Sequence, residues 1–295
     1  MTASHTFGCA CGCGIYEVGT SAMMPTDTGP TAYLDFDYQD QNQNWSGDSA
    51  APAANNDDKD IRTSWYTFGY QQMFSREWGL RIDLPYEERH FVTTGGATGD
   101  QIVAMNFRGF SDARIEGIYT GLSADLSTGL MFGLKLPSGS YRIEDAYNDI
   151  DRDTEIGTGS TDLLLGGYHR FFIANGWDGF AQVMLDVPAL TQAQYRPGME
   201  FDASVGTYFH GFSWGLLHVS PLAQLKLALR DRDHGAAAAN PIASGYARLF
   251  AGPGLEVDWH PWMLYAAVQL PFYQDMRGNQ LIARVQYQMN VSYRF

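Results

Sequence analysis

The last sixteen residues, Gln280-Leu-Ile-Ala-Arg-Val-Gln-Tyr-Gln-Met-Asn-Val-Ser-Tyr-Arg-Phe295, alternate between polar and apolar side chains. The odd positions are all apolar, and the even positions are polar except Ile282. Because successive side chains of a strand point to opposite faces, the stretch predicts one apolar and one polar face. It is far longer than a usual strand of about 5–6 residues. A tilted strand that crosses a bilayer and protrudes beyond it reaches this length.

The same alternation recurs along the chain and predicts about twelve strands. In one example, Ile82 and Leu84 alternate with Arg81 and Asp83. The predicted strands cover 31–44, 61–74, 79–91, 103–120, 126–137, 159–173, 177–189, 199–211, 213–230, 243–259, 262–273 and 280–295. Short turns alternate with long loops rich in Gly, Asn and Asp, at 45–60, 92–102, 138–158, 190–198, 231–242 and 274–279. Short periplasmic turns and long extracellular loops are typical of outer-membrane barrels. We therefore predict an all-β, transmembrane, antiparallel β-barrel.

Composition excludes several other classes of protein. The net charge of −14 argues against nucleic-acid binding, which needs clustered Lys and Arg. The hydrophobic fraction of 45% argues against a disordered chain. No stretch reaches the roughly 18 consecutive apolar residues of a membrane-spanning helix. The remaining alternative is a soluble β-sandwich, and the length of the strands argues against it.

The tryptophans give an independent indication of orientation. Five of the seven lie beside the short turns: Trp78, Trp177, Trp214, Trp259 and Trp262. Aromatic girdles mark both membrane interfaces of outer-membrane barrels. We therefore expect these side chains at the periplasmic interface.

Two short segments resemble a known family. They are Gly133-Leu-Lys-Leu-Pro-Ser-Gly139 and Gly157-Thr-Gly-Ser-Thr-Asp162, the second followed by a strand that contains Tyr168. Together they resemble the "meta-pathway of phenol degradation" family of outer-membrane transporters, over roughly residues 100–295. The resemblance implies a twelve-stranded bacterial outer-membrane barrel that acts as a channel for hydrophobic compounds. The family offers no catalytic residues to transfer.

The three cysteines form a separate cluster ahead of the first predicted strand. Cys9, Cys11 and Cys13 have the spacing Cys-X-Cys-X-Cys, and His5 lies just before them. Three thiolates could bind one soft metal ion or metal cluster, with His5 as a fourth ligand. The alternatives are one disulfide beside a free or modified thiol, or some other role. No signal peptide precedes the cluster, so we expect the chain to be a mature form with an added Met1.

Charged side chains on the polar faces of the predicted strands should line the lumen. They are Asp35, Asp37, Arg81, Asp83, Arg114, Glu116, Lys135, Asp186, Asp202, Lys226, Arg248, Glu256, Asp258 and Arg284. They could line a water-filled channel or form a packed ion-pair network with no pathway. The acidic loop 138–158 could meet lipopolysaccharide through divalent cations such as Ca²⁺. A solvated loop is the simpler interpretation.

An enzyme is not expected. Outer-membrane phospholipases carry His-X-Ser-Asn-Gly, which this sequence lacks. His169, His210 and His218 show no spacing to Ser and Asp that predicts a triad.

We predict an N-terminal segment, 1–30, that lies on the periplasmic side or plugs the lumen, and a barrel over 31–295 in the bacterial outer membrane. The expected function is passage of a small solute, which the family resemblance implies to be hydrophobic. The alternative is a barrel that scaffolds a periplasmic metal or redox site at the cysteines. The expected partners are membrane lipid, lipopolysaccharide, the solute and a periplasmic protein at the N-terminal segment.

Overall fold

The computed structural model describes residues 24–144 and 150–295, and these residues form β-strands joined by turns and loops. The first strands are β1 (Gly29–Gly47), β2 (Ser49–Ala50), β3 (Asp58–Met73), β4 (Trp78–Gly95), β5 (Gln101–Phe110), β6 (Arg114–Tyr119) and β7 (Thr128–Lys135). The remaining strands are β8 (Ser160–Ala174), β9 (Trp177–Thr191), β10 (Glu200–Phe209), β11 (Phe212–Trp214), β12 (Leu217–Arg230), β13 (Tyr246–Trp259) and β14 (Trp262–Arg294). Two short 3₁₀ turns, η2 (Ala53–Asn55) and η3 (Pro241–Ala243), lie in loops. The described residues contain no helix long and apolar enough to cross a membrane.

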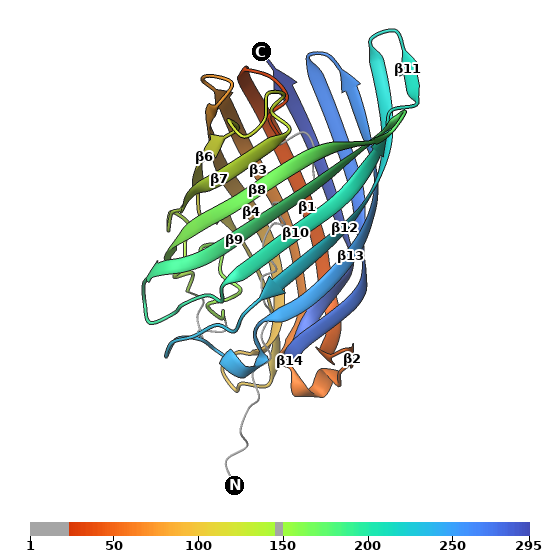
Figure 1. Ribbon diagram of the computed structural model, residues 1–295. Helices are drawn as coiled ribbons and strands as arrows, with labels where there is room; N and C mark the ends of the chain where they lie inside the picture. The colour runs from red at the N-terminus through yellow and green to blue at the C-terminus, as the bar shows by residue number, and fades with distance from the viewer. Residues whose placement is uncertain (1–23, 145–149) are drawn as a thin grey trace.

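Antiparallel pairing closes these strands into a barrel (Figure 1). The ring runs β10-β9-β8-β7-β6-β4-β3-β1-β14-β13-β12, and pairing of β12 with β10 completes it. Among the described residues, β2, β5 and β11 lie outside this ring of eleven. Closure gives every ring strand a hydrogen-bonded neighbour on both sides, which is what a sheet within lipid requires. The predicted fold class is confirmed.

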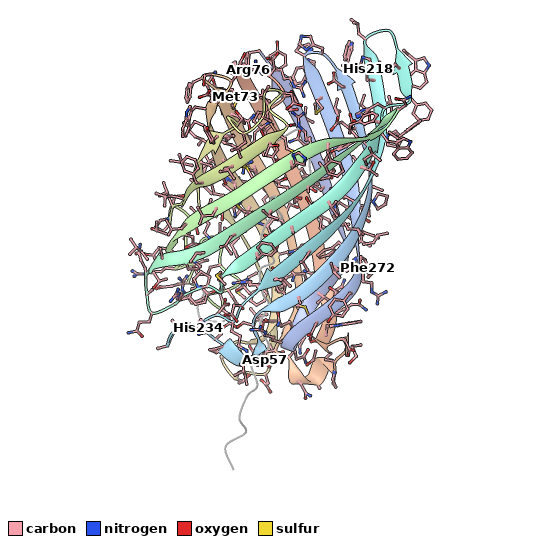
Figure 2. All side chains as sticks on the ribbon, viewed as in Figure 1. Asp57, Met73, Arg76, His218, His234 and Phe272 are labelled. Carbon is pink, nitrogen blue, oxygen red and sulfur yellow. The ribbon has the colours of Figure 1, made fainter. Side chains whose placement is uncertain are left out.

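The alternation of side chains places the two faces as the sequence predicts. On β4, Arg81 and Asp83 are buried, whereas Ile82 and Leu84 are 40% and 37% exposed. Phe272, labelled in Figure 2, lies on the outside of the barrel wall, and its side chain is 60% exposed. A closed barrel with an apolar outer face and a polar interior is built for the bacterial outer membrane.

Short turns gather at one end of the barrel and longer loops at the other (Figure 1). Arg76 and His218 mark the short-turn end in Figure 2, and Asp57 and His234 mark the opposite end. The five tryptophans of the short turns are all exposed: Trp78, Trp177, Trp214, Trp259 and Trp262. Their place is the one that a periplasmic girdle requires.

A second aromatic row lies further along the outer face of β1, β3, β4 and β5. Phe36 is paired with Tyr66, Tyr66 with Tyr86, and Tyr86 with Phe110. From Trp78 to Tyr86 the strand β4 advances about 27 Å, at about 3.4 Å per residue. At the tilt of about 35–45° that such barrels have, this length rises roughly 19–22 Å along the membrane normal, close to the apolar band of about 25 Å. The row lies where an aromatic girdle at the second membrane interface is expected on this side of the barrel.

Several predicted strands differ from the structure. The predicted strand 213–230 contains the turn between β11 and β12, where Gly215 has a φ of 63°. The predicted strand 103–120 is interrupted at 111–113, where β5 ends and β6 begins. The predicted strands 262–273 and 280–295 are the two arms of β14, which pairs first with β13 and then with β1, both antiparallel. Because both pairings are antiparallel, the chain reverses direction within β14, where Gly278 has a φ of 79°. The turn between the two arms of β14 is shorter than the predicted loop 274–279.

The prediction that Arg284 faces the lumen is wrong. Pairing of β14 with β1 shifts register between Gln39 and Gln41. The shift leaves Arg284 exposed and buries Ala283. An extra residue in a strand moves the following side chains to the opposite face.

Candidate functional site

The barrel interior holds buried networks of charged side chains. In the first, Arg81 Nε lies 3.0 Å from Asp83 Oδ2, and Arg81 Nη2 lies 2.8 Å from Glu116 Oε2. The Tyr33 hydroxyl donates a hydrogen bond to the Asp83 carboxylate. These four side chains come from β1, β4 and β6, and all are buried. Charges of opposite sign offset part of the cost of removing each from water.

A second network joins β7, β8 and β9. Lys135 Nζ lies 3.1 Å from Asp186 Oδ2 and also pairs with Asp162. Further round the barrel, Lys226 donates to Gln288 Oε1 at 2.8 Å, and Asn290 donates to Asp35 Oδ1 at 2.6 Å. Charged and amide side chains therefore cross-link strands that are distant in sequence.

The predicted lumen residues fall into three groups. Nine are buried: Asp35, Arg81, Asp83, Glu116, Lys135, Asp202, Lys226, Arg248 and Glu256. Four are partly buried: Asp37, Arg114, Asp186 and Asp258. Arg284 alone of the fourteen lies on the exposed face.

A cavity of about 120 Å³ lies inside the barrel toward the long-loop end. Its wall includes Trp65 on β3, Glu87 and Arg89 on β4, Asp186 on β9 and Asp202 on β10. It has room for about eight to twelve water molecules, at roughly 10–15 Å³ each on this measure of volume. Residues of seven strands and of the segments 111–112, 152–158 and 195–198 line the cavity, and many of their side chains are charged.

Asp112, in the break between β5 and β6, organises one side of this cavity. The backbone N–H of Gly139 donates to Asp112 Oδ1 at 3.0 Å. The N–H and the hydroxyl of Thr158 donate to Asp112 Oδ2 at 2.8 and 2.6 Å. The sequence did not single out Asp112, although the segments that it binds are the two that carry the family resemblance. Its partners lie too far away in sequence to show a local pattern.

The end of the acidic loop folds inward rather than into solvent. Arg89 donates to the backbone carbonyls of Thr154 and Glu155, the latter at 3.1 Å. Thr154 is fully buried, and burial raises the pKa of Glu155. The expectation of a solvated loop is therefore wrong for these residues. The segment lines the cavity instead.

A second hollow opens at the short-turn end, with a volume of about 530 Å³. Phe171, Phe180, Arg170 and Arg294 lie in its wall. Close by, Met24 is buried against Tyr168, Phe180 and Tyr265. Arg170 Nη2 donates to the carbonyl of Pro25 at 3.2 Å. The described residues that precede β1 thus enter the lumen at this end.

The structure brings together a serine, a histidine and an aspartate that the sequence analysis did not connect. His210 Nδ1 lies 3.0 Å from Ser220 Oγ, and His210 Nε2 lies 3.1 Å from Asp178 Oδ2. Ser220 is buried, whereas the side chains of His210 and Asp178 are 44% and 54% exposed. The three residues join β9, β12 and the turn after β10, beside the seam that closes the barrel. We interpret the cluster as a structural contact that links these strands where the pairing of β10 with β12 closes the barrel.

The other two histidines of interest have single serine or threonine partners. His169 Nδ1 lies 2.8 Å from Thr128 Oγ1, and His218 Nδ1 lies 2.9 Å from Ser213 Oγ. Both histidine contacts are exposed.

The predicted metal ligands Cys9, Cys11, Cys13 and His5 lie outside the described residues. Within the described residues, no group of three or more His, Cys, Asp and Glu side chains could hold a metal ion.

Comparison with known proteins gives fold similarity without a family assignment. No protein-family model matches the chain. No curated protein matches it either. An outer-membrane channel from Pseudomonas putida F1 has a similar structure, with a TM-score of 0.66 and 9% sequence identity over 95% of this chain and 100% of that one. The β domain of the Bordetella autotransporter BrkA is similar with a TM-score of 0.53 and 14% identity, over 91% of this chain and 100% of that domain. These likenesses establish the outer-membrane barrel fold.

Proposed function

We propose that this barrel passes a small solute across the outer membrane through its polar interior. The observation that carries the proposal is the pair of hollows at opposite ends of the lumen, one of about 120 Å³ and one of about 530 Å³. Buried charged side chains lie between them, beside a small apolar cluster of Met73, Ile118, Met131, Leu164 and Met184. Water and small polar molecules pass more readily along such a lining than through packed hydrocarbon. The similarity to a solved outer-membrane channel supports the same proposal.

The lining bears on the nature of the solute. The family resemblance implies a hydrophobic compound, and the aromatic side chains of the short-turn hollow suit one. The long-loop cavity is rich in charged groups instead. A solute with a polar group and a short apolar part would suit both hollows.

Osmotic swelling of proteoliposomes tests the proposal. The full chain is reconstituted, and swelling is followed in isotonic solutions of glycerol, a pentose and a disaccharide. The proposal expects swelling that is fastest with glycerol and declines with solute size. Swelling no faster than in protein-free vesicles would refute passage of small solutes. Heat-modifiable migration on a gel provides the control for folding, because closed barrels resist unfolding by detergent at room temperature.

The metal-site alternative concerns residues outside the described part of the chain, and it stays a prediction. Metal analysis and thiol titration of protein purified from its own outer membrane would test it. Bound metal with protected thiols would favour it, and three freely titrating thiols would reject it. A triple Cys→Ser variant that retains swelling would separate it from solute passage.

A further inference from the structure

Carboxylates gather on one wall of the long-loop cavity. Glu200 on β10 is paired directly with Asp186 on β9, and Asp202 follows on the same face of β10. Seven carboxylate side chains line the cavity in all, against five cationic ones. The lining therefore carries an excess of formal negative charge, as does the whole chain at −14.

The hydrogen bonds of these carboxylates are incomplete within the described residues. Glu200 Oε1 accepts from the Tyr246 hydroxyl at 2.8 Å, and Asp186 Oδ2 accepts from Lys135 at 3.1 Å. Asp186 Oδ1 and Asp202 Oδ1 are both buried without a hydrogen-bond partner. Asp202 is only 8% exposed, so water shields its charge poorly. A buried acceptor without a donor costs about 1–3 kcal/mol, and more when it is charged.

Two of the cationic side chains around the cavity bind other carboxylates, whereas Lys135 binds Asp186 itself and Arg114 lies near both Asp186 and Asp202. Arg89 binds Glu87 at 3.1 Å, and Arg230 binds Asp233 at 2.9 Å. The charge of Arg89 and Arg230 is thus partly neutralised, whereas the buried Asp186 Oδ1 and Asp202 Oδ1 have no hydrogen-bond donor among the described residues. A ligand that donates hydrogen bonds and carries positive charge would complement this arrangement.

An ammonium group fits the chemistry of the wall better than the alternatives. It has three donors and one positive charge, and it can bridge two carboxylate oxygens at once. A metal ion is a poorer fit, since the described residues offer no cluster of three ligands. Trp65 also lines the cavity, and its ring can cover a short alkyl chain or stack on a cation.

We propose that the cavity binds the ammonium group of a small primary amine at Asp186 and Asp202. The inference deepens the proposed function, because it names the class of solute that the lumen would select. Binding can nevertheless be measured without flux. The two claims can therefore fail separately.

The test uses the purified, full-length chain in detergent and three probes of matched size: n-butylammonium, butyrate and butanol. Isothermal titration calorimetry at pH 7 and low salt measures binding of each. The inference expects saturable binding of n-butylammonium, with affinity at least tenfold higher than that of butyrate or butanol. Equal binding of the three probes, or no binding of the amine, would overturn it.

Charge-neutralising variants test the residues. Asp202→Asn and Asp186→Asn should each weaken n-butylammonium binding about tenfold or more, because each removes a charged acceptor at nearly constant volume. Asp40→Asn, on the outer wall, is the matched control and should bind as the unaltered chain does. Heat-modifiable migration verifies that each variant folds. If one variant fails to fold, the other still tests the assignment. Wild-type affinity in both folded variants would refute the assignment.

Flux then separates the inference from the proposed function. Amine binding that depends on Asp202, in vesicles that do not swell, would uphold the site and refute solute passage. Swelling that shows no preference between n-butylammonium and butyrate, with no amine binding, would uphold passage and refute the site.

Discussion

Thr158 donates two hydrogen bonds to the carboxylate of Asp112, one from its backbone N–H at 2.8 Å and one from its hydroxyl at 2.6 Å, across 46 positions of sequence. The same carboxylate binds the N–H of Gly139. It therefore ties together the two segments that follow β7 and precede β8. Gly139 and Gly157 lie so close that a Cβ on Gly157 would sit 2.4 Å from the Gly139 carbonyl carbon. These contacts lie at the part of the barrel wall where β5 ends and β6 begins.

Asp112→Ala should destabilise this part of the barrel. The variant loses three hydrogen bonds to a charged acceptor and leaves the buried donor of Gly139 and the partly buried donors of Thr158 without this partner. We expect a loss of about 3 kcal/mol, since hydrogen bonds to charged groups contribute about 1.5–3 kcal/mol each and their losses overlap. Thermal unfolding followed by heat-modifiable migration measures the change. Asp125→Ala, at an exposed turn, is the control. Equal midpoints for both variants would contradict the role of Asp112.

Leu225→Arg should impair insertion. Leu225 lies near the middle of β12 and is 49% exposed on the apolar outer face. A cation at the bilayer midplane costs about 2–4 kcal/mol on a lipid-facing strand. Folding yield into vesicles and resistance to urea report the effect. Leu122→Arg, at a short turn with similar exposure, should fold like the unaltered chain. If both variants folded equally well, the outer face of β12 would not face lipid.

The exposed tryptophans of the short-turn end should lie near the lipid headgroups. Fluorescence of Trp78, Trp177, Trp214, Trp259 and Trp262 should therefore be quenched more by bromine placed near the headgroup than near the centre of the bilayer. Trp45 and Trp65 do not lie beside the short turns. A variant that replaces both with Phe therefore restricts the fluorescence to the five tryptophans of the short-turn end. Strongest quenching at the centre would show that the girdle is misplaced.

The cluster of Ser220, His210 and Asp178 should be structural. We expect His210→Ala to lower the free energy of unfolding by about 1–2 kcal/mol, since the buried hydroxyl of Ser220 then loses its hydrogen-bond partner. The same urea titration measures this, with His169→Ala, at an exposed site, as the control. Ser220 should not react with a fluorophosphonate probe. Labelling of Ser220 that His210→Ala abolishes would instead identify a hydrolase site.

Alternation predicts facing wherever the pairing of strands is regular, as on β4, because a period of two needs no distant information. It failed at Arg284, since the register shift that exposes this side chain depends on the pairing partner, β1. The role of Asp112 could not be predicted for a similar reason. Its donors lie 27 and 46 positions away, and no local spacing encodes them.

The interior charges illustrate the same limit. Of the fourteen charged residues that the polar faces of the strands predicted to line the lumen, thirteen are buried or partly buried. Their partners were not predictable, because Lys135 meets Asp186 only through the pairing of three strands. The unpaired oxygens of Asp186 and Asp202, which suggest a ligand, follow from that arrangement rather than from spacing.

Ion current through the reconstituted barrel tests solute passage most directly. The full chain is inserted into a planar lipid bilayer, and current is recorded under a salt gradient. The account predicts discrete current steps with a reversal potential that favours cations over anions, because carboxylates outnumber cationic groups around the long-loop cavity. Inserted, folded protein that passes no current would contradict the account.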